Sequence, residues 1–307
     1  MIASIFDKSK PINFVIVIII TFLTFLYVNI KEFSESFSML FLLERAAFFL
    51  LSIFSIFLLN FIVVKNKLLN QSSYHILLFS LFLALLPITL ISAKILISNI
   101  FVLLALRRLI SLRTQKNTKK KIFDASLWLG IAAGFYFWAI LFFVLIFIAL
   151  FLYSDNKIKD WIISFTGIMV VFLISVCYNL IIYDNLDLIL NHLPKFNFDL
   201  NSYNSIQIIA SISVILSFSI WSTSFYIRAI KSKLKIFKAP HKIIVATLLL
   251  SLAVVVFSNQ RSTGEFVFIF APLAIITSNY IESINEQWFK NVFLATIVLA
   301  PIVILFL

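Results

Sequence analysis

An uninterrupted apolar run of 29 residues, 125–153, constrains the fold of this chain more than any other feature. It follows a strongly basic segment, 107–121. A single helix of that length would be about 43 Å long, whereas the hydrocarbon core of a bilayer is about 30 Å thick. The run therefore forms either one steeply tilted helix or a hairpin of two short segments. The choice decides on which side of the membrane every later loop lies.

The composition is that of an integral membrane protein. Hydrophobic residues make up 62% of the chain, charged residues 12%, and the mean hydropathy is +1.09, far from the values of soluble globular proteins. We predict an all-α fold, a polytopic transmembrane helix bundle of about 10 to 11 spans, in a single integral membrane domain, 1–307. Besides the 125–153 run, the predicted spans are 11–30, 45–64, 74–91, 95–110, 160–183, 206–228, 242–258, 265–281 and 289–307.

The distribution of charge favours the hairpin. If 125–153 reverses, one side of the membrane carries a net charge of +14 and the other −2, which is the asymmetry that the positive-inside rule describes. If it crosses once, the basic segment 228–242 would lie outside. We therefore predict a turn near Phe135 to Trp138, a cytoplasmic N-terminus and an external C-terminus. Gly130 and Gly134 on the first arm would allow close helix packing.

We expect a multi-pass protein of the bacterial inner membrane. Abundant Phe, Ile, Lys and Asn are typical of an AT-rich bacterial genome, which indicates the bacterial source. The basic residues lie in short loops, where orientation and anionic lipids explain them. We therefore expect membrane lipids as partners and no nucleic acid. The single cysteine, Cys177, excludes an intramolecular disulfide, and we expect it to be buried within a helix.

Two glutamates follow the first span on the predicted external face. Glu32 and Glu35 are three residues apart, so in a helix they share a face and could act as a general base or hold a divalent metal. The alternative is that they only make a short loop soluble.

Arg261 lies in a short external turn, four residues before Glu265. Arginine is well shaped to grip a phosphate through paired N–H donors. The alternatives are an ion pair with Glu265 or snorkelling at the interface. The longest external loop, 184–205, is acidic and rich in Asn, and it could form an amphipathic interfacial helix. Its His192 has no second ligand at metal-binding spacing.

Common catalytic motifs are missing from the sequence. It contains no Walker-type glycine loop, GxSxG, HExxH or GxGxxG, which argues against an ATPase, a serine hydrolase and a zincin. The predicted spans carry few polar groups, which disfavours a transporter.

Three segments together resemble a known family. SLFLALLPITLISAKILISNIFVLLALRRL reads as an apolar helix ending in proline, a short external turn, and a Leu-rich helix ending in basic residues. ASLWLGIAAGFYFWAILFFVLIF reads as a short Gly-rich helix that reverses, and RSTGEFVFIFAPLAII as an external arginine before a proline-containing span. In this order they resemble the membrane core of the GT-C glycosyltransferases, which take sugars from polyprenyl-phosphate donors at the outer membrane face. The chain also resembles a family of uncharacterised bacterial inner-membrane proteins of about this length.

The GT-C resemblance implies roles for the external residues. Glu32 or Glu35 would be the catalytic base or a metal ligand, and Arg261 with Lys94 would hold the phosphate of a polyprenyl-phosphate-linked sugar. The 184–205 loop, with His192 and Lys195, would cover the cleft. This chain departs from the family pattern in its short first external loop, which lacks Asp, and in having no acidic cluster near Lys94.

Two functional hypotheses follow. The first is a GT-C-like membrane glycosyltransferase or a catalytically degenerate relative of one. The second is a non-catalytic membrane scaffold or assembly subunit, with membrane proteins as partners.

Overall fold

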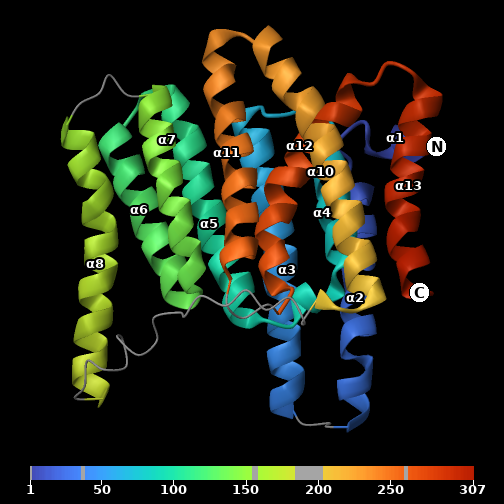
Figure 1. The fold of residues 1–307 in the computed structure, drawn as a ribbon, viewed down its shortest axis with the longest axis horizontal. Coiled ribbons are helices and arrows are strands. Elements are labelled where there is room, and N and C mark those ends of the chain that lie inside the picture. Colours follow the sequence, from blue (N-terminus) through green and yellow to red (C-terminus); the bar gives the residue numbers. More distant parts are fainter. Residues whose placement is uncertain (1, 36–38, 154–157, 184–202, 259–261) are drawn as a thin grey trace. The chain divides into compact units, whose positions relative to one another are not determined.

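The chain folds into α-helices and short 3-10 helices. The computed structural model describes residues 2–35, 39–153, 158–183, 203–258 and 262–307, without the side chains of 2 and 31–35 (Figure 1). No strand occurs within these ranges, so the all-α prediction is confirmed for them. Eight of the described helices are long and apolar enough to cross a membrane. By the length and composition of its helices, the chain is a multi-pass membrane protein.

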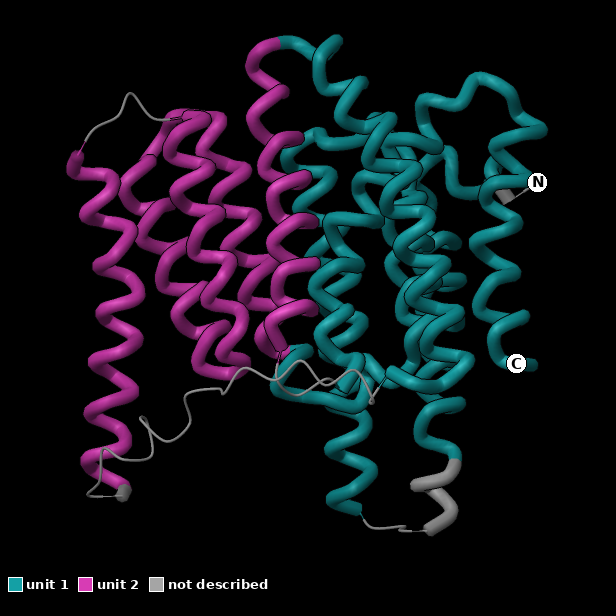
Figure 2. Tube along the Cα trace, in the orientation of Figure 1, with its two compact units in different colours: residues 1–96, 199–234, 261–307 teal, residues 97–198, 235–260 magenta. Residues whose placement is uncertain are grey.

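The helices form two compact units (Figure 2). Unit 1 consists of residues 1–96, 199–234 and 261–307, and unit 2 of 97–198 and 235–260. That the chain forms a single membrane domain stays a prediction. The elements of unit 1 are α1 (Ile2–Phe6), α2 (Pro11–Glu35), α3 (Met39–Asn66), α4 (Tyr74–Leu85), η1 (Pro87–Leu90), α10 (Ile206–Ser232), η5 (Gly264–Phe266), α12 (Val267–Ser283) and α13 (Gln287–Leu305). Those of unit 2 are η2 (Leu112–Thr114), α6 (Thr118–Phe135), η3 (Phe137–Phe142), α7 (Phe143–Tyr153), α8 (Ile158–Tyr183) and α11 (Lys235–Phe257), and α5 (Ala93–Ser111) begins in unit 1 and continues in unit 2.

Helix α12 is the core of unit 1. Every residue from Val267 to Ile281 is buried, because the helix packs against both α4 and α10. Phe270 contacts the rings of Phe79 and Phe82 on α4, with centroids 6.2 and 6.0 Å away. A helix that is apolar on all sides belongs in the interior.

The helices of unit 1 run alternately between two ends. The N-terminal end gathers residues 3–8, 70–74 and 282–291, which bond to one another. The far end gathers η1, η5 and the start of α10, where Ser211 donates a hydrogen bond to the Leu85 carbonyl at 2.6 Å. This alternation agrees with the predicted order of crossings, in which the N-terminal end is cytoplasmic.

The 125–153 run reverses inside unit 2. Helix α6 ends at Phe135, and Tyr136 is extended, with φ −142° and ψ 106°, before η3 and α7 continue. The side chain of Gln115, before the run, donates to the carbonyl of Tyr153, at its end, at 2.8 Å. The start of α6 and the end of α7 therefore lie near each other, as a hairpin requires (Figure 1). The alternative of one long tilted helix is wrong.

Three sequence predictions about local structure need correction. Gly134 is not a packing site, because a methyl group built on it would meet nothing within 4 Å. Gly130 does lie at a close approach, because a methyl group built on it would be 3.0 Å from Val171 Cγ2 on α8. The tightest approach is at Gly167, where α8 also lies on α6. Cys177 is exposed on α8 and not buried. The predicted span 74–91 is a helix only to Leu85, because Pro87 has no N–H to continue it and the chain turns into η1.

Candidate functional site

An apolar groove opens at the far end of unit 1. It consists of two adjoining pockets of about 320 and 280 Å³. Both are lined by Tyr27, Ala84, Pro87, Pro301 and Leu305. These residues come from α2, α4, η1 and α13, and α10 adds Ser211 to the larger pocket. No Asp, Glu, Lys, Arg or His lines either pocket among the described residues.

Local sequence explains the shape of the groove wall. Helix α4 stops at Leu85, and Leu86 (φ −127°, ψ 72°) redirects the chain into η1, which starts at Pro87. The hydroxyl of Thr89 donates to the Leu86 carbonyl at 2.7 Å, while Ser211 holds the Leu85 carbonyl. The carbonyls of Leu85 and Leu86 at this helix end are therefore both paired, which holds the wall in place.

The rim of the groove carries two of the segments that the sequence singled out. Ile30 lines the larger pocket, and Glu32 is two residues further along α2. Ile91 lines the same pocket, and Lys94 follows three residues later in the first turn of α5, where its side chain is exposed. The groove thus opens between the helix end that carries Glu32 and Glu35 and the turn that carries Lys94.

The η5 turn lies against the same part of α5. A methyl group built on Gly264 would lie 2.8 Å from Ile95 Cδ1 and 3.8 Å from Ser92 Cβ. The two turns therefore approach closely here, and a larger residue at 264 would displace the end of the Ile95 side chain. Arg261 precedes this turn by three residues. The structure brings together the chain segments that flank Arg261 and Lys94.

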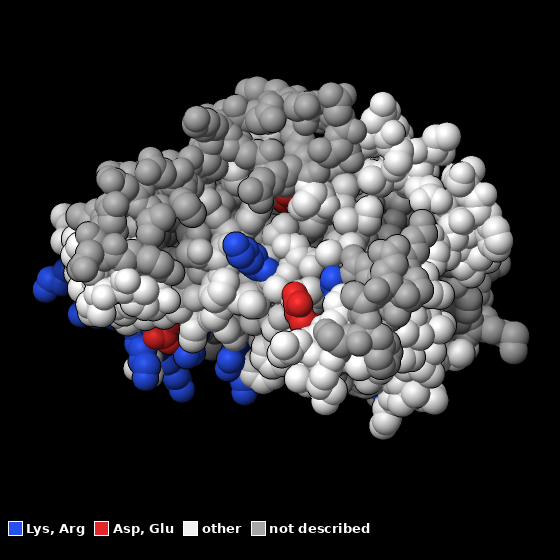
Figure 3. Space-filling model, turned by 90° about the horizontal axis from the view of Figure 1, so that it is seen from below, with Lys and Arg blue, Asp and Glu red and all other residues white. Residues whose placement is uncertain are grey.

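Most predicted site side chains lie outside the described residues. This applies to Glu32, Glu35, Arg261, His192 and Lys195, so their roles stay predictions. Figure 3 shows the face that contains the far end, where blue and red side chains are few in the middle of the described surface. The predicted interfacial helix in 184–205 also falls outside the described part, except for its last three residues.

Glu265 is fully buried in the η5 turn. Its Oε1 accepts the Ser262 backbone N–H at 3.4 Å and lies 3.3 Å from the Ser262 hydroxyl. The carboxylate therefore supports the turn next to Arg261. Within the described residues, no group of three or more His, Cys, Asp or Glu side chains could hold a metal ion.

Sequence reasoning missed the groove itself. Its walls come from helices that are up to about 280 residues apart in the chain, and periodicity within one helix does not reveal which helices are neighbours. Pro87 and Pro301 were visible signals, because proline inside an apolar segment marks a break or an irregular surface.

Comparison with known proteins adds the family. No curated protein and no solved structure matches the chain. A family model described as "Family of unknown function (DUF6427)" matches residues 1–307. Because the match covers residues 1–307, the chain belongs to the family of unknown function DUF6427.

Proposed function

We propose that this protein is a GT-C-like membrane glycosyltransferase, or a catalytically degenerate relative of one, that handles a polyprenyl-phosphate-linked sugar at the outer face of the bacterial inner membrane. The observation that carries the proposal is the apolar groove at the far end of unit 1. In the proposal, the groove receives the part of the polyprenyl chain nearest the phosphate.

The physical case for a chain in the groove rests on shape. Lipid tails are as apolar as the groove, so the hydrophobic effect alone gives no preference for one occupant over another. Close contact between a branched chain and the rigid walls at Tyr27, Pro87 and Pro301 supplies the dispersion energy that a void would forfeit. The phosphate would then lie at the rim, where Lys94 and Arg261 are expected to bind it.

The proposed reaction uses Glu32 and Glu35, which belong to the helix end beside the rim. An acceptor hydroxyl oxygen forms a bond to C1 of the sugar, and the bond from C1 to the phosphate oxygen breaks. Glu32 or Glu35 takes the hydroxyl proton, and the polyprenyl phosphate leaves with the electron pair. Lys94 and Arg261 stabilise the negative charge that grows on the leaving phosphate.

The groove can be filled by a single substitution. Ala84 is half-buried and lines both pockets, so Ala84→Trp places an indole where the chain would lie. In native mass spectrometry of the gently extracted protein, we expect wild-type protein to carry polyprenyl phosphate. We expect the bound fraction to fall about tenfold in Ala84→Trp, which corresponds to about 1.4 kcal/mol.

The matched control is Ala133→Trp, the same change at a half-buried alanine on α6 that lines neither pocket. It should leave the bound lipid unchanged. Wild-type protein that carries no polyprenyl phosphate, or an Ala84→Trp variant that retains it in full, would sink the proposal.

One observation favours the alternative of a non-catalytic scaffold. Helix α8 packs on α6, yet only 6% of its most apolar window is buried. Its free faces carry large exposed side chains such as Phe172, Ile174 and Ile181, which could receive helices of a partner as well as lipid. A stoichiometric protein partner and no bound polyprenyl phosphate in the same mass spectra would select this alternative.

A further inference from the structure

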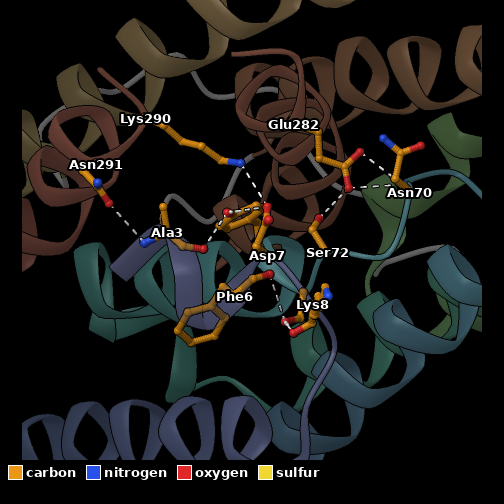
Figure 4. A network of polar contacts seen from close by, with 11 residues as sticks. Ala3, Phe6, Asp7, Lys8, Asn70, Ser72, Glu282, Lys290 and Asn291 are labelled. Carbon is orange, nitrogen blue, oxygen red and sulfur yellow. Dashed lines mark hydrogen bonds and ion pairs between the residues drawn. The ribbon is translucent and has the colours of Figure 1, made fainter. Parts of the chain in front are cut away.

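A polar pocket of about 470 Å³ opens at the N-terminal end of unit 1, away from the groove. Three chain segments build it: the link after α1, the loop before α4, and the α12–α13 region (Figure 4). Four of its seven lining residues are charged, two of each sign. The lining residues are Asp7, Lys8, Asn70, Gln71, Ser72, Glu282 and Lys290.

Lys290 is a buried ammonium with donors to spare. Its side chain is 6% exposed. Its Nζ donates to Asp7 Oδ1 at 3.0 Å and lies 5.1 Å from the centroid of the Tyr74 ring. An ammonium has three N–H donors, and the hydrogen bonds of the described residues use one of them. A buried charge that lines a pocket and keeps free donors is suited to an oxyanion.

Glu282 is a half-buried carboxylate on the same pocket. It accepts the backbone N–H of Asn70 at 3.1 Å and the hydroxyl of Ser72 at 2.6 Å. Neither of the ion pairs found among the described residues includes it. Lys233 is within electrostatic range: burial lowers the pKa of Lys233, and the Glu282 carboxylate raises it. A carboxylate has about four acceptor positions, so Glu282 can still accept from a cationic donor.

The walls that hold these groups are fixed by hydrogen bonds. The Tyr74 hydroxyl donates to the Ala3 carbonyl at 2.8 Å, and the Ser73 N–H donates to the Phe6 carbonyl at 2.9 Å. The Ala3 N–H donates to Asn291 Oδ1 at 3.3 Å. In Figure 4, Lys290 reaches Asp7 from one side, and Glu282 lies toward Asn70 and Ser72 on the other. A pocket whose charges are held apart in this way is organised before a ligand arrives.

We propose that this pocket binds a group that carries both a primary ammonium and a phosphate, the chemistry of a phosphoethanolamine lipid headgroup. The ammonium donates to Glu282, and the phosphate oxygens accept from Lys290 and Lys8. A simple anion would meet the carboxylates of Asp7 and Glu282, and a simple cation would meet the two lysines. The pocket lies where apolar helices end, at the depth at which headgroups are found.

The test compares lipids that differ only in the headgroup. Purified protein is titrated with phosphatidylethanolamine, phosphatidylcholine and phosphatidylglycerol of identical acyl chains, and bound lipid is counted by native mass spectrometry. The trimethylammonium of phosphatidylcholine has no N–H to donate. We therefore expect phosphatidylethanolamine to bind about tenfold more tightly, the effect of one charge-assisted hydrogen bond.

Two variants identify the groups. Glu282→Gln should lower the affinity for phosphatidylethanolamine to that for phosphatidylcholine. Its control is Glu286→Gln, an exposed acid in the short link after α12 that does not line the pocket. Lys8 is exposed, so Lys8→Gln should not affect folding, and it should weaken the binding of all three lipids. Lys10→Gln, at an exposed lysine that does not line the pocket, should leave the binding of each lipid unchanged.

A soluble arm separates the two sources of this chemistry. Thermal stabilisation by free O-phosphoethanolamine would assign the pocket to a soluble molecule with the same groups, and stabilisation only by the lipid would assign it to a headgroup. Equal affinity of the wild-type protein for phosphatidylethanolamine and phosphatidylcholine would overturn the proposal. So would a folded Glu282→Gln variant that keeps the preference.

Discussion

Replacing Gly167 with leucine will separate α8 from α6. A Cβ atom at residue 167 would overlap Ser126 Oγ and would lie 2.7 Å from the backbone nitrogen of Leu127 and 2.8 Å from the carbonyl oxygen of Phe123. Because two of these atoms belong to the backbone of α6, no side-chain rotation relieves the clash. Overpacking of a close interface costs about 1–3 kcal/mol, and leucine adds three more carbons beyond Cβ.

A crosslink next to Gly167 measures the separation. A Cβ atom at Gly130 would lie 3.1 Å from Val171 Cβ, close to the spacing of about 3.5–4.5 Å in disulfides. In a Cys177→Ser background, cysteines at 130 and 171 should therefore oxidise to a disulfide, scored by mass after alkylation. Adding Gly167→Leu should abolish the crosslink. Adding Gly134→Leu, at a glycine with open space around it, should not. Equal crosslinking in both variants would mean that α8 does not lie on α6 through Gly167.

Asp7→Asn will destabilise the protein more than Lys290→Met does. The Asp7 carboxylate is half-exposed, whereas the Lys290 side chain is buried. Asp7→Asn leaves a buried cation without its counter-ion, and Lys290→Met removes that cation while retaining an apolar stem over Tyr74. Because solvent screens the exposed partner, we expect a loss of about 1–2 kcal/mol for Asp7→Asn. Thermal unfolding of the two variants in detergent measures which of them is less stable.

The same pair sets a pH dependence. The hydrogen bond from Lys290 lowers the pKa of Asp7 below its ordinary value of 3.8, against a smaller raising effect of burial. A carboxyl group whose pKa is lower in the folded state contributes its stabilisation in full above its unfolded pKa and loses it as the pH falls through the folded value. The contribution of Asp7 is therefore present in full above pH 3.8, and it declines as the pH falls from there through the lower pKa of the folded state.

In the Asp7→Asn variant, the loss of stability between neutral and acid pH that Asp7 causes should disappear. At neutral pH the variant should remain less stable than the wild-type protein. The control is Glu286→Gln, at an exposed acid outside the network, which should match the wild-type protein at every pH. If Lys290→Met proved more harmful than Asp7→Asn, the buried lysine would not depend on Asp7 in the way described.

The hairpin could be predicted because two independent constraints acted on one segment. The length of 125–153 exceeded one comfortable crossing, and the basic segment 228–242 fixed the side to which the chain must return. The break itself is at Tyr136, an extended residue with neither Pro nor Gly beside it. Its hydroxyl lies 2.7 Å from Ser258 Oγ on the chain just after α11, a tertiary contact that local propensity does not contain.

The groove and the polar pocket could not be predicted for a related reason. Asp7 and Lys290 are far apart in the sequence, and each taken alone is a charge at a predicted membrane interface. The walls of the groove likewise come from helices whose neighbours are set by tertiary packing. Gly167 gave no signal because a single glycine in an apolar helix has several readings.

The reversal of the chain between 118 and 153 is the central claim, since it determines which loops share a face. Single cysteines introduced in a Cys177→Ser background test this claim. They replace Lys116 and Lys159, two exposed residues of which one precedes the hairpin in the sequence and the other follows it. Asn204, exposed at the far end of unit 1, serves as the reference for the opposite face.

The decisive measurement is labelling of these cysteines with a membrane-impermeant maleimide in sealed right-side-out and inside-out vesicles. We predict that positions 116 and 159 react in the inside-out vesicles and are protected in the right-side-out ones, while position 204 behaves in the opposite way. Reaction of 116 and 159 from opposite faces would show that the run crosses the membrane once, and would contradict the hairpin and the shared outer face that follows from it.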